Sequence, residues 1–121
     1  MKEYNKNIGN YGENVVEMFL KNKNHKILHR NFRIRNGEID IISRHKDIII
    51  FTEVKTRYSN NYGAPIQSIT TSKQNNIKRV ANYYIYINNL HNFYIRFDVA
   101  EVILNLIDNS YKINIIENAF N

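Results

Sequence analysis

The chain has 121 residues, 43% of them hydrophobic, and carries a formal net charge of +6. This length suits a single domain, residues 1–121, that buries a core of its own. The chain contains no Cys, which excludes a disulfide framework, a zinc-thiolate site and a thiol nucleophile.

From the sequence we expect neither a signal peptide nor a membrane span. The polar start, MKEYNKNIGN, lacks the apolar centre of a signal peptide, and no apolar run approaches the length of a bilayer span. We therefore expect a cytoplasmic protein with no membrane partner. The positive charge suits a polyanionic partner, although a composition rich in Asn, Lys and Ile could account for it equally well.

The first predicted elements are a helix over residues 9–22 and a strand over residues 27–34. Apolar residues recur at helical spacing in the first segment and alternate in the second. Glu13 lies close to the predicted helix start, where the helix dipole alone would explain a carboxylate. Arg30, Arg33 and Arg35 are either solvated charges of a sheet edge or phosphate contacts.

A β-hairpin is predicted over residues 37–57, with apolar arms at residues 39–43 and 48–54 around a charged tip. If the turn is centred between Lys46 and Asp47, Ile42 faces Phe51. The same register places Asp40 opposite Glu53 and Glu38 opposite Lys55.

Two carboxylates that face each other destabilise a sheet unless something compensates their charge. A proton, a neighbouring cation or a bound divalent metal can do so. Lys55 follows Glu53 on the same face of the strand. The alternatives are therefore a cross-strand salt-bridge cluster and a metal site with a lysine beside it.

The second half of the chain predicts a loop, a helix and two strands. Residues 58–66 have no period and hold the only Pro, as expected of a surface loop. Thr70, Thr71 and Ser72 are candidate N-caps for a helix that runs to about residue 89. Lys73 and Gln74 in its first turn are either solvated or placed to bind nucleic acid. Strands follow at residues 93–106 and 112–116.

The order of elements is α-β-β-β-α-β-β. One helix on each side of a mixed five-stranded sheet would bury the central strands on both faces, which explains why residues 48–51 are apolar without alternation. The predicted class is an α/β layered domain.

The acidic hairpin carries a known signature, since Asp40 followed by Glu53-Val54-Lys55 matches the PD-(D/E)XK motif of nucleases. A wider pattern covers nearly the whole chain and resembles the YraN family of small bacterial proteins, uncharacterised protein family 0102. It consists of Gly12-Glu13, Asn31-Phe32-Arg33, Gly37-Glu38-Ile39-Asp40, Phe51 to Arg57, Tyr62-Gly63, Ser72-Lys73-Gln74, Arg96-Phe97-Asp98 and Glu117-Asn118-Ala119-Phe120.

Two positions depart from the family pattern. Val16 stands where the family tends to have a small residue, and Asn24 replaces a usual turn glycine. Asn tolerates such a turn better than most residues. Both departures lie in or just after the first helix, outside the acidic cluster.

The resemblance implies a restriction-endonuclease-like fold, similar to archaeal Holliday-junction resolvases and tRNA-endonuclease-like domains. It also implies a nucleic-acid partner, DNA in preference to RNA, and allows a homodimer on symmetric junctions. The expected contacts to nucleic acid are Arg33, Arg57, Lys73 and Gln74.

The predicted chemistry is phosphodiester hydrolysis supported by Mg²⁺ or Mn²⁺. Asp40, Glu53 and the carbonyl of Val54 would hold the metal, and Lys55 would orient or polarise the attacking water. By resemblance to the resolvases, Glu13 would approach the same metal. The alternative is a binding module that keeps the nuclease-like fold without turnover.

Overall fold

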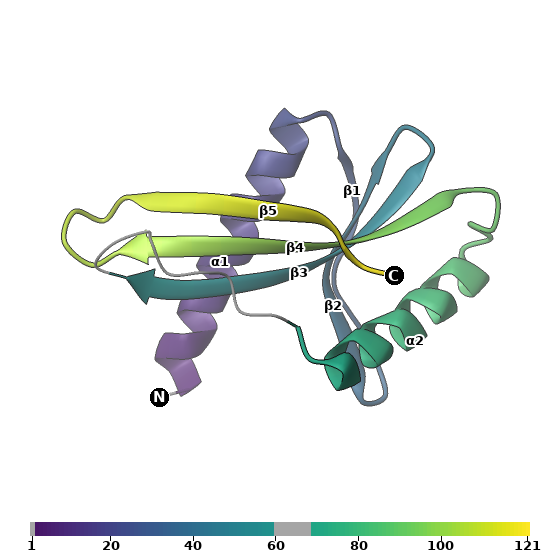
Figure 1. Cartoon of the computed structure of the whole chain (residues 1–121), viewed down its shortest axis with the longest axis horizontal. Helices are drawn as coiled ribbons and strands as arrows, with labels where there is room; N and C mark the ends of the chain where they lie inside the picture. The colour runs from purple at the N-terminus through teal and green to yellow at the C-terminus, as the bar shows by residue number, and fades with distance from the viewer. Residues whose placement is uncertain (1, 60–68) are drawn as a thin grey trace.

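The computed structural model describes residues 2–59 and 69–121, and its elements follow the predicted order (Figure 1). The elements are α1 (Lys2–Asn22), β1 (Lys26–Ile34), β2 (Gly37–His45), β3 (Ile48–Ser59), α2 (Thr71–Ile87), β4 (Tyr94–Asn105) and β5 (Tyr111–Phe120). The predicted α/β class and the α-β-β-β-α-β-β order are confirmed. Over residues 2–59 and 69–121, no helix has both the length and the apolarity to cross a membrane.

The five strands form one mixed sheet in the order β1-β2-β3-β4-β5. Strands β3 and β4 are parallel and pair from Ile48–Tyr94 to Ser59–Asn105, whereas the other neighbours are antiparallel. Parallel neighbours need a crossover connection, and α2 lies within it.

The two helices cover opposite faces of the sheet. One core cluster joins the buried side of α2, including Ile77, Val80 and Tyr84, to Ile42 and Phe51 of the hairpin. The other joins Val15, Val16 and Leu20 of α1 to Ile41, Ala100 and Val102 of the sheet. Residues of β2, β3 and β4 are therefore buried on both sides, as their apolar sequence predicts.

The sheet twists strongly between β2 and β3. In Figure 1, β3, β4 and β5 run across the view, whereas β1 and β2 run steeply up and down it. The ladder between β2 and β3 accordingly covers only the hairpin end, from His45–Ile48 to Ile41–Thr52. Beyond Ile41 and Thr52 the two strands separate.

Several boundaries differ from the prediction. Helix α1 begins at Lys2 instead of residue 9, and Ile8 in this added part of the helix packs against the apolar cluster beneath it. Strand β5 continues to Phe120, which pairs with Phe97 and is buried. Of the predicted loop 58–66, the first two residues belong to β3, which pairs with β4 as far as Ser59. The rest of that loop, with Tyr62 and Gly63, lies outside the described residues.

Candidate active site

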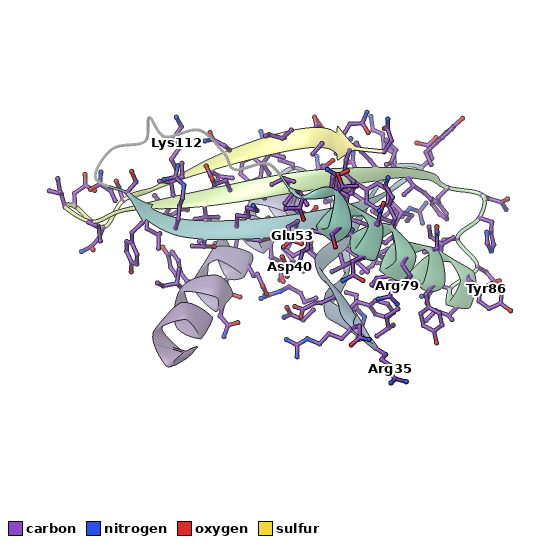
Figure 2. The ribbon with its side chains drawn as sticks, turned by 60° about the horizontal axis from the view of Figure 1, so that its bottom comes forward. Arg35, Asp40, Glu53, Arg79, Tyr86 and Lys112 are labelled. Carbon is purple, nitrogen blue, oxygen red and sulfur yellow. The ribbon has the colours of Figure 1, made fainter. Side chains whose placement is uncertain are left out.

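A pocket of about 440 Å³ lies where β2 leaves the side of β3. Its lining includes the three carboxylates of Glu13, Asp40 and Glu53, which come from α1, β2 and β3, together with Val54 and Arg57. Figure 2 shows Asp40 and Glu53 next to each other in this region. The fold thus brings together the acidic residues that the sequence singled out.

The predicted hairpin register is confirmed where the two strands pair. Ile42 lies opposite Phe51, and the last ladder pair is Ile41 with Thr52. Asp40 and Glu53 are the next residues along each strand, at the point of separation. They consequently line a pocket instead of forming a ladder pair.

The predicted position of Glu38 opposite Lys55 in the ladder is wrong. Because the strands separate after Ile41 and Thr52, Glu38 is a ladder partner of Arg33 in β1 instead. Their side chains form an ion pair, with Arg33 Nε donating to Glu38 Oε2 over 2.8 Å. Arg33, a predicted nucleic-acid contact, is 71% exposed but shares its charge with this carboxylate.

Val54 lies beyond the end of the β2–β3 ladder, and the side chain of Asp40 accepts its backbone hydrogen bond in place of a strand partner. The backbone N–H of Val54 donates to Asp40 Oδ2 over 2.8 Å. A β-strand residue that uses its N–H toward one neighbouring strand directs its carbonyl the same way. The carbonyl of Val54 therefore points to the side of β3 on which Asp40 lies.

The electrostatics of the pocket disfavour two negative charges. Burial, followed by the charge of Glu53, raises the pKa of Asp40 to about 8, although the Val54 N–H opposes the rise. Burial also raises the pKa of Glu53, and the charges of Lys73 and Lys55 offset this only in part. The nearby lysines do not fully compensate the buried acids.

The first turn of α2 approaches the pocket from the opposite side to α1. Lys73 Nζ lies 3.7 Å from Glu53 Oε1, a long ion pair with the lysine 46% exposed. Thr70 is the N-cap, since its side chain accepts a hydrogen bond from the Lys73 N–H over 3.1 Å. Gln74, another predicted nucleic-acid contact, donates its side-chain amide to the Ile69 carbonyl over 2.9 Å. Lys73 is thus near the acids, whereas the Gln74 amide supports the start of the helix.

Glu13 reaches the pocket because α1 lies directly against β3. A Cβ atom on Gly12 would overlap Oγ1 of Thr56, so only glycine permits this approach. Since α1 begins at Lys2, Glu13 is in mid-helix, and the helix dipole does not explain its position. Its Oε1 accepts a hydrogen bond from Arg30 Nη2 over 3.0 Å.

Arg30 and Glu101 are two residues whose roles were not recognised in the sequence. Arg30, predicted to be a solvated charge or a phosphate contact, instead bridges Glu13 and Glu17 of α1. Glu101 of β4 is only 1% exposed and accepts a hydrogen bond from Arg57 Nε over 3.2 Å. A single acid within the apolar run of β4 was the available signal for Glu101.

The side chains as they stand do not form a closed metal cage. Within residues 2–59 and 69–121, no three His, Asp or Glu groups lie close enough to hold an ion together. Glu13 is engaged by Arg30, and Glu53 is drawn toward Lys73. The pocket therefore offers two adjacent carboxylates and a third that is already paired.

Comparison with known proteins relates the whole chain to one family. A sequence model described as "Uncharacterised protein family UPF0102" matches residues 12–102. A UPF0102 protein of Clostridium novyi is 54% identical over 120 residues, which cover 99% of this chain and 100% of that protein. UPF0102 proteins of Clostridium perfringens and Clostridium botulinum are 48% and 51% identical, over 99% and 96% of this chain and 98% and 95% of theirs. The names of these relatives give the family and no activity.

Proposed function

The chain belongs to the uncharacterised protein family UPF0102, and we propose that it is a metal-dependent endonuclease acting on structured or branched nucleic acid, DNA in preference to RNA. The observation that carries this proposal is the convergence of Glu13, Asp40 and Glu53 from three separate elements on one pocket. Positively charged side chains border the same pocket, as a polyanionic substrate requires.

The donor set fits a hard divalent cation. Asp40, Glu53 and the carbonyl of Val54 would hold Mg²⁺ or Mn²⁺ through oxygen atoms. Two carboxylates are enough, because Mg²⁺ keeps several of its waters in protein sites. Glu13 would join the donors only after its carboxylate leaves Arg30. Burial raises the pKa of both Asp40 and Glu53, and the charge of Glu53 adds to the rise at Asp40. A bound cation would stabilise the charged form of each carboxylate.

When bound, such an ion supplies an acidified water and stabilises negative charge on the phosphate. Lys55, on the same face of β3 as Glu53, would orient or polarise the attacking water. Arg57 lines the pocket and Lys73 lies beside Glu53, so both are placed to contact the flanking phosphates. Asp40 is held in position by the Val54 N–H.

The alternative is a nucleic-acid-binding module on the same fold. Binding alone would be served by exposed cations, whereas two buried carboxylates with raised pKa values weaken the fold. A cost in stability at a polar pocket is typical of catalytic sites. The two buried acids therefore favour hydrolysis over binding alone.

Incubation with duplex, flap and four-way-junction DNA, and with their RNA counterparts, tests the proposal in the presence of Mn²⁺. We expect cleavage of a branched substrate by the natural protein and none by Asp40→Ala. Glu117→Gln is the matched control, because Glu117 lies on β5, is 62% exposed and pairs with Arg96 of β4. Binding without cleavage that depends on both metal and Asp40 would support the binding module instead.

A further inference from the structure

The outer face of α2 carries one continuous stripe of polar and aromatic side chains. Ser72, Arg79, Tyr83 and Tyr86 follow one another at intervals of seven, four and three residues, which places them on one side of an α-helix. The opposite side of α2 is buried against the sheet. At a rise of about 1.5 Å per residue, the stripe extends for about 21 Å.

The stripe begins beside the candidate active site. A hollow at its start is lined by Ser72, Lys73, Asn76 and Arg79, together with Thr70 and Asn75. Lys73 also forms the long ion pair with Glu53. The hollow on the outer face of α2 therefore adjoins Glu53, which lines the acidic pocket.

This face is suited to a negatively charged chain. Neither Asp nor Glu occurs in the sequence between Glu53 and Asp98, so all of α2 is free of carboxylates. Its charged residues are Lys73, Lys78 and Arg79. A polyanion lying along α2 meets no repulsive side chain of that helix.

Arg79 is fixed in place by the turn between β1 and β2. Its Nη2 lies 3.2 Å from the carbonyl oxygen of Arg35, 3.1 Å from that of Asn36 and 2.7 Å from Asn76 Oδ1. The residue is nevertheless exposed, and Figure 2 shows Arg79 on the outer side of α2. A guanidinium held in this way loses little freedom when it binds a phosphate.

Two tyrosines end the stripe at the far end of the helix. Tyr83 is 48% exposed and Tyr86 is 71% exposed. The ring of Tyr83 is stacked on Phe32 of β1, with centroids 6.5 Å apart and an angle of 26° between the planes. Aromatic rings of this kind stack on bases, and only unpaired bases present their faces for stacking.

We propose that the outer face of α2 binds a single-stranded segment of nucleic acid that leaves the active site, with phosphates at Arg79 and bases on Tyr83 and Tyr86. The inference rests on the proposed function, which gives nucleic acid as the substrate. It adds that this nucleic acid is a junction between a duplex and a single strand. Duplex DNA would use the cations of the stripe and leave the tyrosines without partners.

Fluorescence anisotropy in EDTA tests this without cleavage. The probes are a labelled blunt duplex, the same duplex with a single-stranded tail, and the tail alone. We expect the tail to strengthen binding by roughly tenfold or more, and the double substitution Tyr83→Ala with Tyr86→Ala to abolish that gain. The double substitution to Phe, which keeps the rings, should preserve it.

Tyr111→Ala is the matched control, because Tyr111 is 49% exposed and is the first residue of β5. The start of β5 lies at the other end of the sheet from α2 (Figure 1). Thermal melting verifies that each variant is folded. The inference is overturned if the natural protein shows no gain from the tail, or if the gain survives in the double Ala variant.

The outcomes separate this inference from the proposed function. Tail binding that depends on the tyrosines, in a protein that cleaves nothing, would keep the inference and reject the nuclease. Cleavage that depends on Asp40 without any effect of the tyrosines would keep the nuclease and reject the inference.

Discussion

Asp40 has two roles, since it accepts a backbone hydrogen bond of the sheet and contributes a carboxylate to the candidate site. Its carboxylate accepts a hydrogen bond from the N–H of Val54, which lies beyond the β2–β3 ladder. The same carboxylate is buried close to Glu53. Asp40→Asn retains a side-chain oxygen for that N–H and removes the negative charge. This substitution therefore separates the structural role of the residue from its electrostatic one.

Divalent metal should stabilise the natural protein and leave Asp40→Asn unchanged. At roughly ten times the Kd, a ligand of the folded state adds about 1.4 kcal/mol to the free energy of unfolding, which raises Tm by a few degrees. Melting with Mg²⁺ or Mn²⁺ against EDTA measures the effect, with Glu117→Gln as the control that should respond like the natural protein. Equal shifts in the natural protein and Asp40→Asn would contradict the assignment of the metal ligands.

The contribution of Asp40 to the stability of the metal-free protein should fall as pH rises from about 4 to about 8. The pKa of Asp40 is about 8 in the folded protein and near 3.9 in an unfolded chain, so the folded state binds the extra proton in this window. The free energy of unfolding should decrease by about 1 kcal/mol per pH unit relative to Asp40→Asn.

Urea denaturation in EDTA at several pH values measures this difference. The comparison also removes the contribution of His25, whose pKa is lowered by burial and which both proteins share. Parallel stability curves for the two proteins would show that Asp40 does not take up the proton.

At the scale of the elements, the site depends on how closely α1 approaches β3. Gly12 faces Thr56 across a contact that leaves no room for a Cβ atom, and the next residue is Glu13. Arg30 of β1 then holds the Glu13 carboxylate. The packing of one glycine thus determines whether the third acid reaches the pocket.

Gly12→Ala should lower the free energy of unfolding by roughly 1–3 kcal/mol, because the added methyl group overlaps Thr56 and pushes α1 away from β3. Gly9→Ala is the matched control in the same helix, since a Cβ atom there has no neighbour within 4 Å. The control should gain roughly 0.5–1 kcal/mol from the helix preference of Ala. Equal effects of the two substitutions, measured by urea denaturation, would rule out the close contact.

At the scale of the whole molecule, the net charge of +6 is distributed unevenly along the chain. The long segment between Glu53 and Asp98 contains no acid and supplies Lys73 and Arg79 to the outer side of the site. Several other cations are paired with carboxylates, as Arg30 is with Glu13, Arg33 with Glu38 and Arg57 with Glu101. Net charge alone therefore does not indicate where nucleic acid binds.

The salt dependence of binding should identify the cations that contact phosphate. Each phosphate contact contributes roughly 0.7–0.9 to the slope of log Kobs against log salt concentration. Arg79→Gln and Lys73→Gln should each reduce the slope by about that amount. Lys112→Gln should not, because Lys112 is exposed at the far end of the sheet from α2 (Figure 2). If Lys112→Gln reduced the salt-dependence slope by as much, nucleic acid would bind the protein without preference for the face that carries α2.

Much of the fold follows from local patterns. The order of elements, the Ile42–Phe51 register and the Thr70 cap were predictable, because periodicity, turn position and capping act over a few neighbouring residues. Asn24 also adopts the left-handed conformation expected of a residue that replaces a turn glycine, with φ of 69°.

The candidate site was predictable only in part. Local sequence patterns suffice to predict the α/β class, the hairpin and the candidate site residues Asp40, Glu53 and Lys55. Local patterns do not predict that β2 separates from β3 just before the two acids, that Arg30 pairs with Glu13, or that Glu101 lies buried beside Arg57. These contacts join residues far apart in the chain and depend on the twist of the sheet and the docking of α1, which the packing of the whole core sets.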